Sequence, residues 1–130
     1  MRKIISTILV CVLLLGCVAI LASCGTPDSD PKAAKAALEE EGYTVTLKEN
    51  YGEYAATIFA YNNNIKEKKY DEITIYYFKD AAAANAAWDT LSEVYAKEAE
   101  SKKDTDYEIE YGIDGKIIYV GTVDAVGAAN

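Results

Sequence analysis

Glu108 and Glu110 are the two acidic residues of this chain whose spacing could support catalysis. They lie two residues apart in a segment that alternates as a strand does, so both point to one face with Cα atoms about 6.6 Å apart. Glycosidases use two carboxyls about 5 to 9.5 Å apart, one on either side of the scissile bond. Acids on one strand face point in parallel and flank no bond. We therefore interpret this pair as a solvated face and assign no catalytic residue.

The acidic run from Asp104 to Glu110 also offers the oxygen ligands that calcium prefers. An EF-hand loop that began at Asp104 would need glycine at its sixth position, where Ile109 stands. The pattern therefore fails. Beyond weak, nonspecific cation binding, the sequence predicts neither a metal site nor a cofactor.

The composition excludes several other chemistries. The chain has no histidine, so neither a histidine triad nor a histidine zinc site can form. Its one arginine is Arg2, and its cysteines are Cys11, Cys17 and Cys24. The residues after Cys24 carry 11 lysines against 21 acids, a balance that repels phosphate backbones. We expect no nucleic-acid partner and no enzyme activity.

Tyrosine is the residue type that stands out, with 11 Tyr against 2 Phe. A tyrosine ring offers contact area and its hydroxyl offers a hydrogen bond, which suits a protein, peptide or glycan partner. Tyrosine is also a strong strand former, so the alternative is that these residues only fill a half-exposed sheet. The alternation places Tyr43, Tyr54, Tyr95 and Tyr111 on core faces, with Tyr54 on the same face of its strand as Ala56. Five others are expected at turns or on the opposite, outer face of the sheet: Tyr51, Tyr61, Tyr70, Tyr76 and Tyr119. Of these, Tyr61, Tyr76 and Tyr119 are the candidate ligand-binding residues.

The first 23 residues have the layout of a secretory signal. Arg2 and Lys3 form a short positive region, and the uncharged stretch 4–22 follows and ends in small residues. Length alone does not separate this interpretation from a transmembrane helix, because about 18 apolar residues can span a bilayer.

Leu21, Ala22, Ser23 and Cys24 separate the two alternatives, since they resemble the lipobox of bacterial lipoproteins at all four positions. The resemblance implies that a signal peptidase removes residues 1–23 and that the Cys24 thiol carries a diacylglyceryl group, often with a further acyl chain such as palmitate on the new amino terminus. Two or more acyl chains anchor a protein stably. We therefore expect a lipid-anchored protein on the extracytoplasmic face of the cell membrane. Residues 24–30 would form the lipidated cysteine and a short tether, and residues 31–130 one small domain.

The rest of the chain alternates between helical and strand patterns. Asp30 and Pro31 suit the start of a helix that ends at Gly42. A longer helix begins at Asp80 and runs to about residue 99, with Trp88 on its apolar stripe. Strands are expected at 43–48, 54–61, 72–78, 107–111 and 116–120, with a short closing helix from residue 122.

This order predicts an α+β fold, an antiparallel or mixed sheet of about five strands with helices packed on one face, in the order α-β-β-β-α-β-β and a last short helix. In the final hairpin a turn at Asp114-Gly115 would pair Tyr111 with Ile118. The segments Gly-Tyr-Thr-Val-Thr from residue 42 and Asp-Tyr-Glu-Ile-Glu from residue 106 both open a strand pair after a helix. This echo is consistent with duplicated α-β-β units.

Over most of the region after Cys24 the chain resembles small uncharacterised lipoproteins of Gram-positive-type bacteria. The resemblance rests on the lipobox and on residues 38–45, 73–80 and 118–122, together with the helix around Trp88. It implies a helix-on-sheet domain and no established activity, so it carries over no functional residues. We expect a membrane-anchored, non-catalytic binding or accessory module. The alternatives are a small carboxylate-dependent hydrolase and a structural envelope or spacer protein.

Overall fold

The computed structural model describes residues 26–130, which form one antiparallel sheet and three helices. The strands are β1 (Thr44–Tyr51), β2 (Tyr54–Asn64), β3 (Lys69–Phe78), β4 (Ile109–Asp114) and β5 (Ile117–Thr122). The helices are α2 (Pro31–Glu40), α3 (Ala81–Lys102) and α4 (Val123–Ala128). The α+β class, the five strands and their order along the chain are those predicted from the sequence. The predicted signal peptide, its cleavage point and Cys24 lie outside the described residues.

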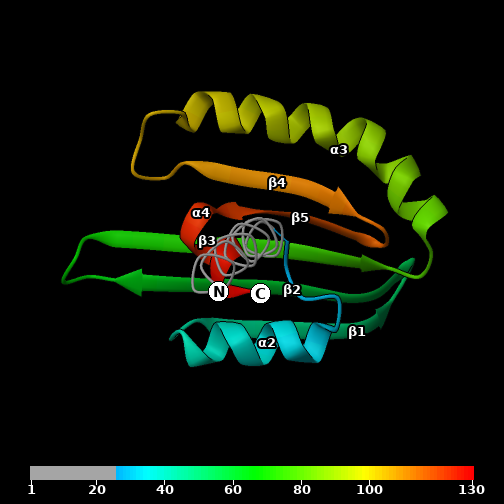
Figure 1. Cartoon of the computed structure of the whole chain (residues 1–130), viewed down its shortest axis with the longest axis horizontal. Coiled ribbons are helices and arrows are strands. Elements are labelled where there is room, and N and C mark those ends of the chain that lie inside the picture. The colour runs from blue at the N-terminus through cyan, green and yellow to red at the C-terminus, as the bar shows by residue number, and fades with distance from the viewer. Residues whose placement is uncertain (1–25) are drawn as a thin grey trace, which may run out of the picture.

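The strands lie in the spatial order β1-β2-β3-β5-β4, so that β1 and β4 are the edges of the sheet (Figure 1). Every neighbouring pair is antiparallel. In the β4–β5 hairpin Tyr111 pairs with Val120 and not with Ile118, so the predicted register was two residues out. The turn lies at Gly115 and Lys116. Gly115 has a φ of 59°, the positive value that the first central residue of a type II′ turn requires.

The two longer helices each begin after a capping aspartate. Lys32 N donates to Asp30 Oδ1 at 3.0 Å, ahead of α2, and Ala83 N donates to Asp80 Oδ1 at 2.7 Å, ahead of α3. These bonds satisfy amide groups that the first turn of a helix leaves unpaired. Both helix starts therefore follow from local sequence.

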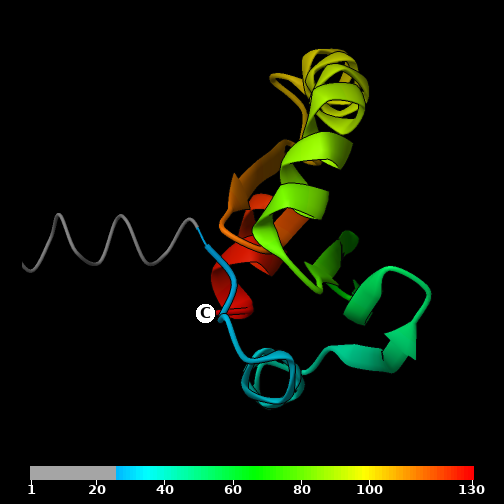
Figure 2. The same cartoon turned by 90° about the vertical axis from the view of Figure 1, so that its right-hand side faces the viewer.

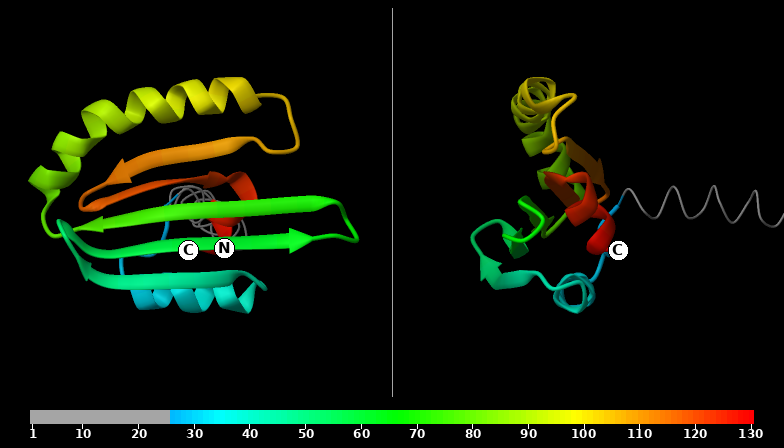
Figure 3. Two further views of the ribbon diagram at one scale, coloured as in Figure 1. Left: turned by 180° about the vertical axis from the view of Figure 1, so that it is seen from behind. Right: turned by 90° about the vertical axis from the view of Figure 1, so that its left-hand side faces the viewer.

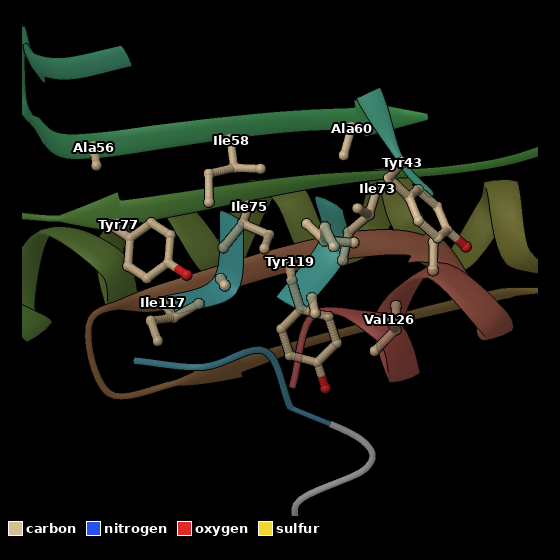
Figure 4. Close-up of a cluster of buried hydrophobic side chains, with 14 residues drawn as sticks. Tyr43, Ala56, Ile58, Ala60, Ile73, Ile75, Tyr77, Ile117, Tyr119 and Val126 are labelled. Atoms are coloured by element: carbon tan, nitrogen blue, oxygen red, sulfur yellow. The ribbon is translucent and has the colours of Figure 1, made fainter. Parts of the chain in front are cut away.

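The helices lie on both faces of the sheet, so the prediction that they share one face was wrong. α2 and α4 pack against the face that bears Ile58, Ile73 and Ile75 (Figure 4). α3 packs against the other face, over Phe78 and Ile118. The reason lies in β3 and β5, whose successive side chains are apolar on both sides of the sheet. Without a helix over it, each of these faces would leave its apolar side chains exposed to water, which is unfavourable.

This arrangement agrees with the predicted α-β-β repeat. β1 and β2 lie on one side of β3, β4 and β5 lie on the other, and the antiparallel pairings make β1 parallel to β4. A half-turn about β3 would carry β1 onto β4 and exchange the two faces of the sheet. The helix before β4 is accordingly opposite the helix before β1. In the same way Leu47 of β1 faces α2, whereas the corresponding Tyr111 of β4 faces α3.

α3 covers only part of its face of the sheet. It contacts mainly β4, β5 and β3. Figures 2 and 3 show α3 running along the β4 side of the sheet, while the β1–β2 side bends away from it. The β1–β2 part of this face therefore lies beyond the helix.

A bulge in β2 turns one aromatic side chain onto the α3 face. Tyr54 pairs with Phe78 but Ala56 pairs with Tyr77, so the register shifts at Ala55. A bulge breaks the two-residue alternation of a strand. Ala56 therefore lies in the core beneath α2 and α4, while Tyr54 packs on the α3 side. The prediction that Tyr54 shares a core face with Ala56 was wrong for this reason.

Candidate functional site: an aromatic face on strands β1 to β3

Six aromatic side chains gather on the face of β1, β2 and β3 that points to the α3 side. We call this surface the aromatic face, and it consists of Tyr51, Tyr54, Phe59, Tyr61, Tyr70 and Tyr76. Phe59 and Tyr61 belong to it because they alternate with Ile58 and Ala60, which are buried on the opposite face. Three rings of the face are well exposed: Tyr51 by 62%, Phe59 by 42% and Tyr61 by 38%. Exposed apolar side chains that gather in one contiguous patch often mark an interaction site.

One end of the aromatic face is held in place by α3. The Tyr54 ring lies 5.0 Å from the Phe78 ring at an interplanar angle of 66°, and 5.3 Å from the Tyr76 ring. Tyr76 in turn is hydrogen-bonded to Tyr95 of α3. Burial, followed by the neighbouring Tyr76, raises the pKa of Tyr95 above its usual range. Tyr54 and Tyr76 are therefore held in defined positions, and they line the same hollow as the exposed Tyr51.

The other end of the face is a short stack of rings. Phe59 and Tyr61 of β2 have ring centroids 6.1 Å apart, and Tyr61 lies 6.5 Å from Tyr70 of β3 at an angle of 24°. The Tyr70 hydroxyl donates to Glu72 Oε2 at 3.0 Å. These contacts hold rings that are partly open to solvent in defined positions.

A shallow hollow of about 370 Å³ lies between the two ends. Its polar lining consists of the Thr46, Thr57 and Thr74 side chains together with Lys48. The Lys48 Nζ lies 5.9 Å from the centre of the Tyr51 ring, within the range of a cation–π contact. From Tyr54 to Tyr61 the face extends roughly 23 Å along β2. The surface is thus an elongated row of rings with hydroxyl groups between them.

Two of the three tyrosines predicted as ligand-binding residues belong to this face. Tyr61 and Tyr76 lie on it, at opposite ends. Tyr119 does not, because it pairs with Ile75 and so shares the face that α2 and α4 cover. It is only 8% exposed, and a Cβ on the neighbouring Gly112 would lie 2.5 Å from its hydroxyl oxygen. The assignment of Tyr119 to the outer face was therefore wrong.

Four members of the face were not among the candidate ligand-binding residues: Tyr51, Tyr54, Phe59 and Tyr70. Tyr51 and Tyr70 were expected only at turns or on the outer face. Phe59 was visible in principle, since it follows the same alternation as Tyr61. Tyr54 was hidden by the bulge at Ala55, and Tyr51 follows Asn50, whose φ of 52° interrupts β1. Asn tolerates this left-handed conformation better than most residues. The alternation of apolar and polar residues along the strand does not predict it.

Glu108 and Glu110, which were predicted to form a solvated face, lie away from the aromatic face. Glu110 is on β4, and Glu108 lies just before it. Glu108 lines a cleft of about 440 Å³ together with Asp71, Asp124 and Lys69, and Glu110 is not part of that lining. Lys69 forms ion pairs with Asp124 and, at 3.9 Å, with Asp71. Two of the cleft acids that come from distant segments, Asp71 and Asp124, are thus paired with Lys69, and Glu67 also lines the cleft.

Glu110 itself is half-buried on the face opposite α3. Burial, followed by the charge of Glu108, raises the pKa of its carboxyl above the ordinary value. Within residues 26–130 no three acidic or cysteine side chains come close enough to hold a metal ion. The Glu108 and Glu110 carboxyls therefore do not line one cleft together.

The described part of the chain contains no helix that is both long enough and apolar enough to cross a membrane. In comparisons with known proteins, no protein-family model matches the chain, and no curated protein or solved structure matches it significantly.

Proposed function

We propose that this chain is a lipid-anchored, extracytoplasmic binding protein whose aromatic face holds a glycan of the cell surface without cleaving it. The lipobox resemblance at Cys24 supports the anchor. The aromatic face supports the binding role. The single observation that carries the proposal is the row of exposed rings, Tyr51, Phe59 and Tyr61, on strands that lie beyond the cover of α3.

The chemistry of the aromatic face favours a glycan over other ligands. Sugar rings present flat C–H surfaces, which stack on aromatic side chains, and hydroxyls, which bond to other hydroxyls. The hollow provides both, because Thr46, Thr57 and Thr74 lie between the rings. Lys48 is the one charged side chain among the residues that line this hollow. A neutral or weakly charged ligand therefore fits this surface better than a nucleic acid or a strongly charged peptide.

The shape of the face favours a chain-like ligand. A small-molecule site usually encloses its ligand in a deep cavity, whereas this hollow is shallow and continues into a row of rings roughly 23 Å long. Such a surface suits several consecutive sugar units. A lipid anchor on the outer side of the membrane would bring this surface close to cell-wall polysaccharide.

Binding of the processed, lipidated protein in detergent to purified cell-wall glycan and to soluble oligosaccharides tests the proposal. Tyr61→Ala should weaken binding roughly 30-fold, because the loss of an aromatic anchor contact costs about 2 kcal/mol. Tyr107→Ala is the matched control, since Tyr107 is 42% exposed against 38% for Tyr61 and lies outside the aromatic face. Equal affinities for the two variants, or no binding to any glycan, would overturn the proposal.

The same assay separates binding from hydrolysis. Because Glu110 stays outside the cleft that Glu108 lines, we expect no release of reducing ends when the wild-type protein is incubated with the glycan. Release that Glu108→Gln abolishes would favour the hydrolase alternative instead.

A further inference from the structure

The segment that precedes α2 is packed against the domain. Asp28 N donates to the carbonyl oxygen of Ala129 at 2.9 Å, and the Tyr77 hydroxyl donates to the Asp28 carbonyl oxygen at 2.7 Å. Pro27 is buried, and Thr26 is hydrogen-bonded to Tyr119. Each of the first three described residues is therefore tied to the sheet or to the chain end after α4.

The packed segment continues without a break into α2. Asp30 N donates to Asp28 Oδ1 at 2.9 Å, and the Asp30 side chain then caps the helix at Lys32. Residues 26–30, which the sequence suggested as part of a tether, are thus held in one conformation as part of the domain.

The packed segment lies on the face of the sheet opposite the aromatic face. Tyr77 and Tyr119, which hold it, belong to the core cluster beneath α2 and α4 (Figure 4). Tyr54 and Tyr76 of the aromatic face belong to the other side, with α3. Figure 2 shows the blue segment that precedes α2 beside the C-terminus, on the side of the sheet opposite α3.

We propose that this packed segment fixes the orientation of the domain on the membrane, with the α4 side against the phospholipid headgroups and the aromatic face turned away from them. The inference rests on the proposed lipid anchor at Cys24. Only Gly25 separates that cysteine from Thr26, and two residues reach about 7 Å at most. A tether of this length leaves the domain little freedom to turn over.

The orientation comes from the tether and not from attraction to charged lipid. Asp28 and Asp30 stand close to the point where the described chain begins, and Asp124 is on α4. These acids would be repelled by anionic headgroups. The orientation should therefore be the same on neutral vesicles and should persist at high salt, where surface charges are screened.

Energy transfer to labelled lipid tests the orientation on the full lipidated protein in phosphatidylcholine vesicles. If Cys24 is lipidated and residues 1–23 are removed, an introduced cysteine is the one free thiol. Gly127→Cys places a fluorophore on α4, where a new Cβ meets no atom within 4 Å. Ala96→Cys places it on an exposed position of α3. Transfer to an acceptor-labelled headgroup should be several-fold more efficient from residue 127 than from residue 96.

The matched control is a long Gly-Ser insertion between Gly25 and Thr26, which leaves every contact of the domain in place. It should bring the two transfer efficiencies close together. Vesicle flotation of the same samples reports the anchor separately. Protein that floats but shows equal transfer from residues 127 and 96 without the insertion would overturn the orientation alone. Protein that does not float would overturn the anchor, and with it the orientation, while leaving glycan binding to be judged by its own assay.

Discussion

Tyr61 of β2 stacks on Tyr70 of β3, with ring centroids 6.5 Å apart and an angle of 24° between the rings. Tyr61 is exposed, and Tyr70 is partly covered and tied through its hydroxyl to Glu72. The stack therefore holds a solvent-facing ring in a fixed position. A ring that is already ordered loses less conformational freedom when a ligand binds, which favours affinity.

Tyr70→Ala should weaken glycan binding about fivefold, because an aromatic pair contributes roughly 1 kcal/mol beyond its buried area. Tyr70→Phe keeps the stack and loses only the bond to Glu72, so its affinity should stay close to that of the wild type. Isothermal titration with a soluble oligosaccharide measures both. If the phenylalanine variant loses as much affinity as the alanine variant, the Tyr61–Tyr70 stack does not account for the contribution of Tyr70 to glycan binding.

Gly121→Ala should lower the free energy of unfolding by roughly 1–3 kcal/mol, as overpacking of a core does. A Cβ at Gly121 would lie 2.7 Å from the Glu72 carbonyl oxygen and 2.8 Å from the Ile73 Cβ, so β5 would have to move away from β3. Gly127→Ala is the control, because its Cβ would meet nothing within 4 Å. That variant should be neutral or up to about 1 kcal/mol more stable. Urea unfolding compares the two, and equal effects would contradict the close approach of β3 and β5.

Glu110→Gln should stabilise the fold at neutral pH. Burial, and secondly the charge of Glu108, raise the pKa of the Glu110 carboxyl. The folded state therefore binds the proton more tightly than the unfolded state does, and stability falls as the pH rises through this pKa. A neutral glutamine avoids that loss. Thermal unfolding should show a higher Tm for the variant at pH 7, and the gain should vanish as the pH falls below about 4.

Glu93→Gln provides the control for this pH dependence, since Glu93 is exposed on α3. Its Tm should follow that of the wild type at every pH. An unchanged or lower Tm for Glu110→Gln at pH 7 would show that the half-buried Glu110 carboxylate does not destabilise the folded state.

Cys24→Ala should abolish both lipid attachment and cleavage. The lipobox resemblance implies that the Cys24 thiol carries the diacylglyceryl group and that a dedicated signal peptidase cuts just before this residue. Labelling of cells with radioactive palmitate and gel mobility of the product test this. The wild-type protein should carry label and run as the shorter form, whereas the variant should be unlabelled and keep residues 1–23. A variant that is still labelled or still cleaved before residue 24 would refute the assignment.

Local rules predicted the parts of the fold that depend on neighbouring residues. Asp30 and Asp80 cap their helices as expected because capping involves only the next few amides. Val45 and Leu47 face the core because a regular strand alternates. Trp88 packs against the hydrophobic cluster between α3 and the sheet, with its ring 6.1 Å from that of Tyr111.

The features that the sequence did not predict depend on pairing between distant strands. The side of the sheet on which Tyr119 lies is set by its pairing with Ile75, 44 residues earlier in the chain. The turn of Tyr54 onto the α3 face depends on a bulge against β3. Both of these pairings decide which side chains belong to the candidate site. Of the three tyrosines predicted to bind a ligand, Tyr61 and Tyr76 lie on the aromatic face and Tyr119 does not. The packing of residues 26–30 likewise depends on Tyr77 and on the chain end, which no local pattern reveals.

The central claim is that a glycan binds on the aromatic face, and an NMR titration of the ¹⁵N-labelled protein with a soluble cell-wall oligosaccharide tests it most directly. We predict saturable shifts at the amides of Thr46, Thr57, Phe59 and Thr74, with little change at Asp124 and Val126. Shifts confined to the cleft around Asp71 and Asp124, or no shifts at any oligosaccharide concentration, would contradict the claim.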